Sequence, residues 1–377
     1  MTRNLLGRCA IAAALAATAI GSAYADTEIT ISSWVGPKHP VNFGGYEPYI
    51  AAVEAASGGA IRFRLFTGGA LLGAKATLAG IRDGIADTGV IALTYHPAEF
   101  PLAQLIADLA LWSDDALVAG AAVTEFNLLH CPACLDEFRA QGLVYNGTYS
   151  TAPYTIIGRR PINVPADLAG LKVRTPGSVW DRWVQHMGAV PVNLPASDMY
   201  ESLERGITDL VLQPVAALRS YSLWDVATDV TNLNLGTFHS LSLLGYGREA
   251  WQGYDAGVRK LLMDNAPVAL IGASQGYVDL DQEVIADADE LKVVIHPPGE
   301  GLVAATRAFA EADRAELAEI SRSRHGIAEP EPMIETFLGL LDKWRAIMAP
   351  IRDDPAKMAA ALKAEVFDHL DPARHGM

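Results

Sequence analysis

Two stretches of the sequence, 122 residues apart, share one local design that limits the folds open to this chain. GIRDGIADTGV (80–90) and SLERGITDLVL (202–212) each carry an apolar residue, a glycine three positions later and an aspartate three positions after that. Each pattern predicts a helix that ends on a C′ glycine and is followed at once by a buried strand. The repeat predicts two lobes of similar design. The alternative is that the pattern is chance or is common to helix-to-strand turns in general.

The length and the neighbouring segments agree with two α/β lobes. The chain has 377 residues, of which 50% are hydrophobic, and single cores stop growing at roughly 250–300 residues. TEITISSW (27–34) and AIRFRLFTGG (60–69) alternate with period two, and a helix over roughly 46–57 is expected between them, ending at Gly58. Alternating strands and helices predict an α/β fold.

Residues 1–25 have the pattern of a secretory signal peptide. Arg3 and Arg8 lead into an apolar run, and a small-x-small site precedes a cleavage expected after Ala25. We therefore expect export to the periplasm. No later apolar run reaches the ~18–20 residues needed to span a bilayer, so the mature chain is expected to be soluble, without direct membrane insertion.

The charge balance excludes some partners. The chain has 29 Lys and Arg against 44 Asp and Glu, a net charge of −15, and losing Arg3 and Arg8 makes it more negative by two. Nucleic acid and anionic membranes are poor partners for such a surface. An anionic ligand would have to be held by a local cationic group.

Cys131 and Cys134 form a Cys-x-x-Cys motif in a chain expected to be exported. The oxidising compartment predicts a structural disulfide. Zinc would need a second ligand pair at suitable spacing. A redox centre would need a strand-to-helix setting, whereas residues 126–142 predict two helical pieces broken near Pro132. We expect no metal and no cofactor.

Polar and aromatic side chains follow both copies of the repeat. Thr94 and Tyr95 end the strand after the first copy, and Gln213 ends the strand after the second. Ligand sites in open α/β sheets lie outside the carboxyl ends of strands. These three residues are therefore expected to face a common cleft.

Arg174 also ends a predicted strand, directly before Thr-Pro-Gly. A guanidinium there presents a rigid fork that suits a carboxylate. The next helix is expected to begin at an N-cap Ser178 with Asp181 in its first turn, and a helix N-terminus favours the same negative charge. The alternative is an ordinary surface arginine at a strand end.

Residues 165–214 resemble the signature segment of the solute-binding proteins of tripartite ATP-independent periplasmic (TRAP) transporters, the DctP-like family. In that family a Pro-x-Asp-Leu-x-Gly-Leu-Lys-hydrophobic-Arg element leads to a Gly-Ala-x-Pro turn, an acidic-x-Tyr helix and then Gly-x-x-Asp. The matching residues are Pro165, Asp167, Leu168, Gly170, Leu171, Lys172, Val173, Arg174, Gly188, Ala189, Pro191, Asp198, Tyr200, Leu203, Gly206 and Asp209. The likeness extends to His39-Pro40 and to a long helical region over about 253–290.

The resemblance implies a two-lobed periplasmic binding protein fold with a strand hinge, a long domain-spanning helix and a ligand cleft between the lobes. It implies residues 26–150 and 240–279 in lobe I, and residues 151–239 and 280–377 in lobe II. The implied function is that of a monomer, not an enzyme, which captures a small organic acid by lobe closure and delivers it to the membrane subunits of a TRAP permease.

The resemblance also assigns roles within the site. Arg174 falls on the arginine that clamps the substrate carboxylate in the family, and Gln213 falls where many members use asparagine. Tyr154 stands where some members carry a second arginine, and Ala196 stands where an aromatic residue is frequent. One carboxylate on an apolar or aromatic body is therefore expected. Ring-bearing candidates for the pocket, each of which is as readily a core residue, are Trp34, His39, Tyr95, Tyr149, Tyr154 and Trp180.

Two other classes of protein remain open at this point. VALIGASQG (268–276) contains a Gly-x-Ser-x-Gly pattern around Ser274, which in a strand-turn-helix setting would be the nucleophile of a serine hydrolase. A long helix accounts for the same segment, and His296 follows too closely for the usual order of triad residues. A binding protein of an ATP-driven importer or of a sensor system would have the same lobes.

Overall fold

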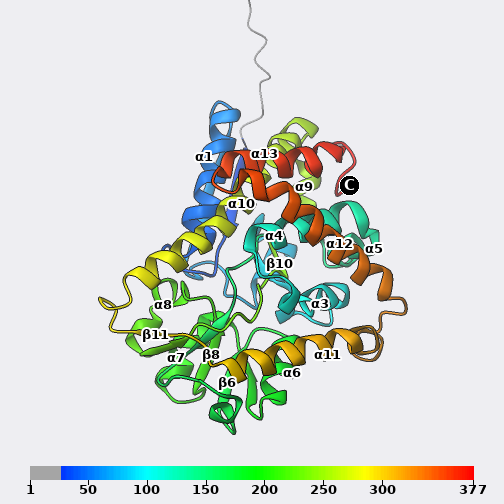
Figure 1. The fold of residues 1–377 in the computed structure, drawn as a ribbon. Helices are drawn as coiled ribbons and strands as arrows, with labels where there is room; N and C mark the ends of the chain where they lie inside the picture. The colour runs from blue at the N-terminus through cyan, green and yellow to red at the C-terminus, as the bar shows by residue number, and fades with distance from the viewer. Residues whose placement is uncertain (1–26) are drawn as a thin grey trace, which may run out of the picture.

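The computed structural model describes residues 27–377, so the expected signal peptide and the cleavage after Ala25 lie outside the described residues. The described chain forms two α/β lobes, each built on its own sheet (Figure 1). Lobe I contains the five-stranded sheet and lobe II the six-stranded sheet. The predicted α/β fold with two lobes is confirmed.

The sheet of lobe I has the order β2-β1-β3-β10-β4. β1 pairs in parallel with β2 and β3, whereas β10 is antiparallel to β3 and β4. Its strands are β1 (Thr27–Ser32), β2 (Ile61–Phe66), β3 (Thr88–Ala92), β4 (Leu143–Tyr145) and β10 (Leu241–Gly247).

The sheet of lobe II has the order β11-β9-β5-β8-β6-β7. β6 lies between two parallel neighbours, β7 and β8, and β5 runs antiparallel to β8 and β9. Its strands are β5 (Thr155–Gly158), β6 (Lys172–Thr175), β7 (Val190–Asn193), β8 (Leu210–Gln213), β9 (Asp229–Thr231) and β11 (Val294–His296).

Helices cover both sheets (Figure 1). Those of lobe I are α1 (Glu47–Ala56), α2 (Thr77–Arg82), α3 (Pro101–Ala107), α4 (Ala116–Glu125), α5 (Pro132–Ala140) and α9 (Arg248–Gly253). Those of lobe II are α6 (Ser178–His186), α7 (Met199–Glu204) and α8 (Ala217–Ser220). α11 (Glu300–His325) packs against both α6 of lobe II and α3 of lobe I.

Within residues 27–377 no single helix is long and apolar enough to cross a membrane. The segments Ala116–His130 and Pro132–Ala140 pass that criterion only as a pair, bent by 89°. Every residue of α4 is buried in the protein. The bend also confirms the predicted break of this region near Pro132.

The long helix α10 (Ala256–Ala286) joins the two lobes. It packs against α1 and α4 in lobe I. Toward its other end, Asp281 accepts a hydrogen bond from the backbone N–H of Ala216, and Asp287 pairs with Arg219 of α8 in lobe II. The predicted domain-spanning helix is therefore present.

The last two helices pack against lobe I. α12 (Glu331–Met348) lies on α4, where Lys343 and the indole N–H of Trp344 bind Glu125, and α13 (Pro355–Glu365) lies on α10. In Figure 1 α13 lies at the top near α1, and α12 runs from there down to the right. The packing contradicts the expected assignment of this part of 280–377 to lobe II, because the apolar face of α12 is buried against α4.

The internal repeat corresponds to one local structure in both lobes. α2 is followed by Gly84 at φ +74° and then β3, and α7 is followed by Gly206 at φ +66° and then β8. Positive φ explains a glycine at both positions. The predicted helix-glycine-strand units are confirmed.

The aspartates of the repeat join neighbouring parallel strands. Asp87, directly before β3, accepts a hydrogen bond of 2.7 Å through Oδ2 from the N–H of Thr30 in β1. Asp209 Oδ2 accepts one of 2.8 Å from the N–H of Lys172 in β6. Each carboxylate therefore holds the start of the repeat's strand beside its parallel neighbour.

Two antiparallel segments, residues 146–154 and 235–244, connect the lobes and form the hinge. Their backbones are joined by hydrogen bonds from Asn146 N to Leu244 O and from Tyr154 N to Gly236 O, at 3.0 and 2.8 Å. The N–H of Ser150 donates to Ser274 Oγ on α10 at 3.0 Å. The hinge segments are therefore tied to the long helix midway between the lobes.

Candidate functional site

Arg174 lies near the end of β6 and is completely buried. Its Nε donates to Leu194 O at 2.8 Å, and its Nη1 lies 3.4 Å from Leu212 O. Both carbonyls belong to lobe II and hold the guanidinium in one orientation. The alternative of an ordinary surface arginine is wrong, because the side chain has no exposed surface.

No carboxylate within residues 27–377 forms an ion pair with Arg174. By contrast Arg182, on the next helix, pairs with Asp108 at 3.1 Å and with Asp313 at 2.6 Å. A charge taken out of water is costly unless a partner compensates it. The position of Arg174 therefore suits an anion supplied from outside the chain.

Tyr95 reaches Arg174 from the other lobe. It ends the short 3₁₀ turn η2 (Leu93–Tyr95) that follows β3, and its Oη accepts hydrogen bonds from Arg174 Nη2 at 3.2 Å and from the N–H of Ala196 at 2.9 Å. A guanidinium and a backbone N–H thus converge on one oxygen. A ligand carboxylate oxygen would find the same two donors.

Tyr154 and Gln213 complete the surroundings of the guanidinium. Burial raises the pKa of Tyr154, while the nearby charge of Arg174 and hydrogen bonds from Arg174 and Gln213 act to lower it. The net effect is upward, so the phenol stays neutral. Some family members carry a second arginine at the position of Tyr154, and this chain has a neutral hydroxyl there.

Aromatic rings pack around the two tyrosines that lie beside Arg174, Tyr154 and Tyr95. Tyr154 stacks on Trp180 with ring centroids 5.2 Å apart and on Phe238 at 6.0 Å. Trp34 lies 6.3 Å from Tyr95, and its indole N–H donates to Val90 O at 2.9 Å. Such a wall of rings favours an apolar or aromatic ligand body.

The remaining predicted residues lie around this centre. Thr94 is buried, its hydroxyl has no hydrogen-bond partner, and its methyl group lies against Gly177. Tyr149 lies on the hinge and stacks on Tyr277 of α10 at 6.0 Å. His39 is buried and meets Arg174 only through other residues, since its Nε2 bonds Tyr277 Oη at 2.9 Å.

Sequence reasoning missed three ring residues of this cluster: Tyr221, Tyr277 and Phe238. Tyr221 packs edge-on against His39 with centroids 5.3 Å apart. Tyr221 lies eight residues after Gln213, so a longer segment beyond the end of β8 would have included it among the candidates. Tyr277 and Phe238 carry no comparable signal, because one lies within a long helix and the other in the hinge.

The expected helix cap at Ser178 is wrong. α6 begins at Ser178 itself, after Gly177, and no side-chain hydrogen bond caps it. The hydroxyl of Ser178 instead donates to Asp108 of lobe I, and Asp181 accepts from Thr175. The serine is used to contact the other lobe, which the local sequence pattern does not reveal.

The Gly-x-Ser-x-Gly pattern has no nucleophile-elbow setting, because it lies in the middle of α10. Ser274 Oγ donates to Leu270 O one turn earlier, at 3.0 Å, and accepts from Ser150. Gly272 permits a close approach, since a Cβ there would lie 2.0 Å from Gly44 O. The glycine therefore allows close helix packing, and the serine holds the hinge segment. The alternative of Ser274 as a hydrolase nucleophile is wrong.

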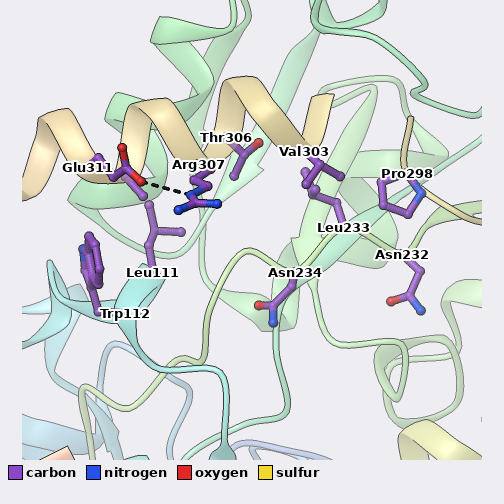
Figure 2. Close-up of a pocket in the computed structure, with 11 residues that line it drawn as sticks. Leu111, Trp112, Asn232, Leu233, Asn234, Pro298, Val303, Thr306, Arg307 and Glu311 are labelled. Atoms are coloured by element: carbon purple, nitrogen blue, oxygen red, sulfur yellow. Dashed lines mark hydrogen bonds and ion pairs between the residues drawn. The ribbon is translucent and has the colours of Figure 1, made fainter. Parts of the chain in front are cut away.

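A cavity of about 480 Å³ lies elsewhere, between α11 and the segments that carry Leu111 and Leu233 (Figure 2). None of the predicted ligand residues lines it. Its cation, Arg307, has a side chain 82% exposed and pairs with Glu311 at 3.0 Å. Solvent and a carboxylate already compensate that charge, so the buried Arg174 is the better candidate for holding an anion.

Cys131 and Cys134 are joined by a disulfide at the start of α5. Cys131 Sγ also accepts a hydrogen bond from the N–H of Cys134 at 3.1 Å. Both residues belong to lobe I and to none of the contacts around Arg174 described above. Across the described part of the chain, no group of three or more His, Cys, Asp or Glu side chains is placed to hold a metal ion.

The sequence profile of the bacterial extracellular solute-binding proteins, family 7, matches residues 31–319. A solute-binding protein of Albidiferax ferrireducens is 24% identical over 196 residues, which are 50% of this chain and 55% of that protein. The C4-dicarboxylate-binding periplasmic protein DctP of Rhodobacter capsulatus is 26% identical over 130 residues, 33% of this chain and 37% of that protein. The chain thus spans little more than half the length of the first of these relatives.

Solved structures of TRAP solute-binding proteins share the fold. One from Bordetella bronchiseptica, with bound (R)- and (S)-mandelate, is 22% identical with a TM-score of 0.73, over 84% of this chain and 99% of that one. A marine metagenome protein with 3-hydroxybenzoate is 20% identical with a TM-score of 0.75, over 85% and 99%. One from Rhodoferax ferrireducens with copurified benzoate is 19% identical with a TM-score of 0.73, over 85% and 99%.

Proposed function

The chain belongs to bacterial extracellular solute-binding protein family 7, and on this premise we propose that it captures a small organic acid in the periplasm by closing its two lobes. It then delivers the acid to the membrane subunits of a TRAP-type permease. The observation that carries the proposal is Arg174, a fully buried guanidinium for which the described chain supplies no carboxylate. The ligand carboxylate takes that place, facing Arg174 and the N–H of Ala196 in lobe II, with Tyr95 of lobe I beside them.

The preferred substrate class is an acid with one carboxylate and an aromatic or bulky apolar body. Tyr154 lies beside Arg174 and stacks on Trp180 and Phe238. Its neutral hydroxyl stands where a second cation would serve a dicarboxylate. The related structures from Bordetella bronchiseptica and Rhodoferax ferrireducens hold mandelate and benzoate. These observations favour aromatic monocarboxylates over succinate or malate.

Calorimetric titration of residues 26–377 tests the binding step, with benzoate, mandelate, succinate and malate as probes. We expect an aromatic acid to bind tightest. Arg174→Ala should weaken that binding by a factor of a few hundred to a few thousand, since truncating one partner of a buried charge pair typically costs roughly 3–5 kcal/mol. Arg307→Ala, which removes the cation of the cavity in Figure 2, is the matched control and should bind as the unaltered protein does.

Two results would contradict this proposal. Affinity unchanged by Arg174→Ala would exclude the carboxylate clamp, and succinate or malate binding tighter than both aromatic acids would exclude the substrate class. Delivery is tested by uptake of the bound acid into proteoliposomes that contain a TRAP permease. Uptake that requires this protein supports the TRAP partner, whereas uptake only into proteoliposomes that contain an ATP-driven importer instead would contradict it.

A further inference from the structure

The hydroxyl oxygen of Tyr95, in lobe I, lies where two hydrogen-bond donors of lobe II converge. We propose that Tyr95 is an internal competitor of the ligand: in the free protein its oxygen occupies the place of a carboxylate oxygen, and an acid must displace it from Arg174 and from the N–H of Ala196. Tyr95 thereby determines how strong an acceptor a ligand must bring. This inference rests on the proposed function, because it concerns the same site.

One loop of lobe II positions both donors. After β7, the carbonyl of Leu194 accepts a hydrogen bond of 2.8 Å from Arg174 Nε, which orients the guanidinium. Two residues later, at the start of the 3₁₀ turn η6 (Ala196–Asp198), the N–H of Ala196 donates to Tyr95 Oη at 2.9 Å. Arg174 Nη2 donates to the same oxygen at 3.2 Å. A cation and a backbone N–H that converge in this way suit a negatively charged oxygen better than a neutral phenol.

The phenol oxygen and a carboxylate oxygen cannot share this position. The N–H of Ala196 has a single hydrogen, and its bond of 2.9 Å to Tyr95 Oη uses that hydrogen. Nε of Arg174 donates to Leu194 O, and Nη1 lies 3.4 Å from Leu212 O, so Nη2 is the guanidinium nitrogen that meets lobe I. A carboxylate that takes both donors must therefore replace the phenol. The exchange is favourable, because an ionised acceptor forms the stronger hydrogen bonds.

Tyr95 is the partner that can withdraw. Arg174 is completely buried and held by two carbonyls of lobe II, whereas Tyr95 is only partly buried. Pro97 and Ala98, which follow it closely, are exposed. The neighbouring Thr94 is buried, and its hydroxyl has no hydrogen-bond partner within residues 27–377. Because an unpaired buried hydroxyl costs free energy, the turn η2 that carries Tyr95 is not locked by a complete set of hydrogen bonds.

The contact joins the two lobes, so it stabilises closure of the free protein. Tyr95 follows β3 in lobe I, and both of its donors belong to lobe II. An acid that takes its place loses this stabilisation. A contact made only in the free form therefore weakens the apparent affinity by the same factor for every ligand that displaces it. A neutral amide gains little from the exchange, whereas a carboxylate also gains the charge interaction with Arg174.

The test is whether removing this hydroxyl tightens binding. Calorimetry on residues 26–377 would use benzoate, mandelate and the neutral benzamide. Tyr95→Phe removes the hydroxyl and keeps the ring, whose centroid lies 6.3 Å from that of Trp34. We expect this variant to bind benzoate and mandelate about fivefold tighter than the unaltered protein does, since a hydrogen-bonded contact has been removed from the free form alone. Benzamide should gain by the same factor yet stay the weaker ligand, because it brings no charge to Arg174.

Small-angle scattering separates competition from a general structural role. Tyr95→Phe should increase the radius of gyration of the free protein, because the lobes lose a contact, and leave that of the benzoate-saturated protein unchanged. Tyr95→Leu, which also lacks the hydroxyl, should open the free protein in the same way. Tyr246→Phe is the control: it removes a buried phenol that bonds Tyr49 at 2.8 Å within lobe I, and it should change neither the scattering nor the affinity.

The outcomes distinguish this inference from the proposed function. Weaker binding in Tyr95→Phe would show that the phenol bonds the ligand instead of competing with it, and this result or an unchanged affinity would overturn the inference while Arg174-dependent binding remained. An unchanged radius of gyration of the free variant would overturn it as well. If no acid bound the unaltered protein, both would be overturned. Tighter binding of both acids together with a more open free protein would support the inference.

Discussion

Replacing Asp108 with asparagine should weaken ligand binding by loosening the closed arrangement of the lobes. Asp108 follows α3 in lobe I and is buried. It accepts hydrogen bonds from Ser178 and from Arg182 Nη1 at 3.1 Å, both on α6 of lobe II, and lies 3.4 Å from His325 Nε2 at the end of α11. The carboxylate therefore joins the two lobes outside the Arg174 site.

The magnitude follows from what the substitution leaves behind. An amide of the same shape loses the negative charge, and a hydrogen bond to a charged group is worth roughly 1.5–3 kcal/mol. Arg182 still pairs bidentately with Asp313, at 2.6 and 2.8 Å, so no buried cation is stranded. Because the lost contact lies between lobes, the cost falls on closure, and Kd should rise about 10- to 150-fold.

The assay is calorimetry with the aromatic acid that binds tightest, together with small-angle scattering of the free and saturated protein. Asp313→Asn is the matched control, because it removes a carboxylate from the same arginine but leaves the contact between Asp108 of lobe I and α6 of lobe II in place. It should lower the melting temperature yet change Kd less than about threefold. An unchanged Kd in Asp108→Asn, or equal weakening by both variants, would refute the reasoning.

Four further outcomes follow from particular contacts. Arg174→Lys should recover only part of the affinity lost in Arg174→Ala in calorimetry, because an ammonium keeps the charge but not the two-point fork. Cys131→Ser should lower the free energy of unfolding in urea by about 1–2 kcal/mol, as expected for a short loop, without changing ligand preference. Ser274→Ala should destabilise the protein by roughly 1–3 kcal/mol in the same assay, since it leaves the buried N–H of Ser150 without its acceptor; an unaltered free energy of unfolding would contradict the hinge role. Burial lowers the pKa of His239 to about 4 from an ordinary value near 6.5, so the unfolded chain binds the extra proton between these values and stability falls with falling pH. His239→Gln should therefore lose about 2 kcal/mol less than the unaltered protein between pH 7 and pH 5, and equal losses would show that His239 does not supply this pH dependence.

Local patterns predicted the parts of the site that lie at strand ends. The repeat located the ends of β3 and β8, and hence Tyr95 and Gln213, because a glycine turn and an aspartate act within a few residues. Arg174 could be found for the same reason, at the break after β6. Its burial and its lack of a carboxylate partner could not, because both depend on the opposite lobe.

Contacts between distant segments explain what the sequence did not predict. The local sequence around Ser178 is typical of a helix cap. The structure shows that its hydroxyl instead donates to Asp108, seventy residues earlier in the chain. The amphipathic face of α12 shows that the helix packs on something, but not that α4 of lobe I is the partner. Tyr277 lies within a helix whose pattern is that of a core, and only the crossing of α10 past the hinge brings it to His39.

The position of the ring residues on the hinge couples recognition to closure. Tyr149 and Tyr154 belong to one hinge segment, and Ser150 between them is held to α10 by Ser274. A ligand held by Arg174 contacts lobe II beside Tyr154 of the hinge, with Tyr95 entering from lobe I. Only interactions that differ between the open and closed forms can shift that equilibrium. An acid too small to reach the ring of Tyr154 would still meet Arg174 but would engage the hinge less, and it should close the lobes less completely at saturation.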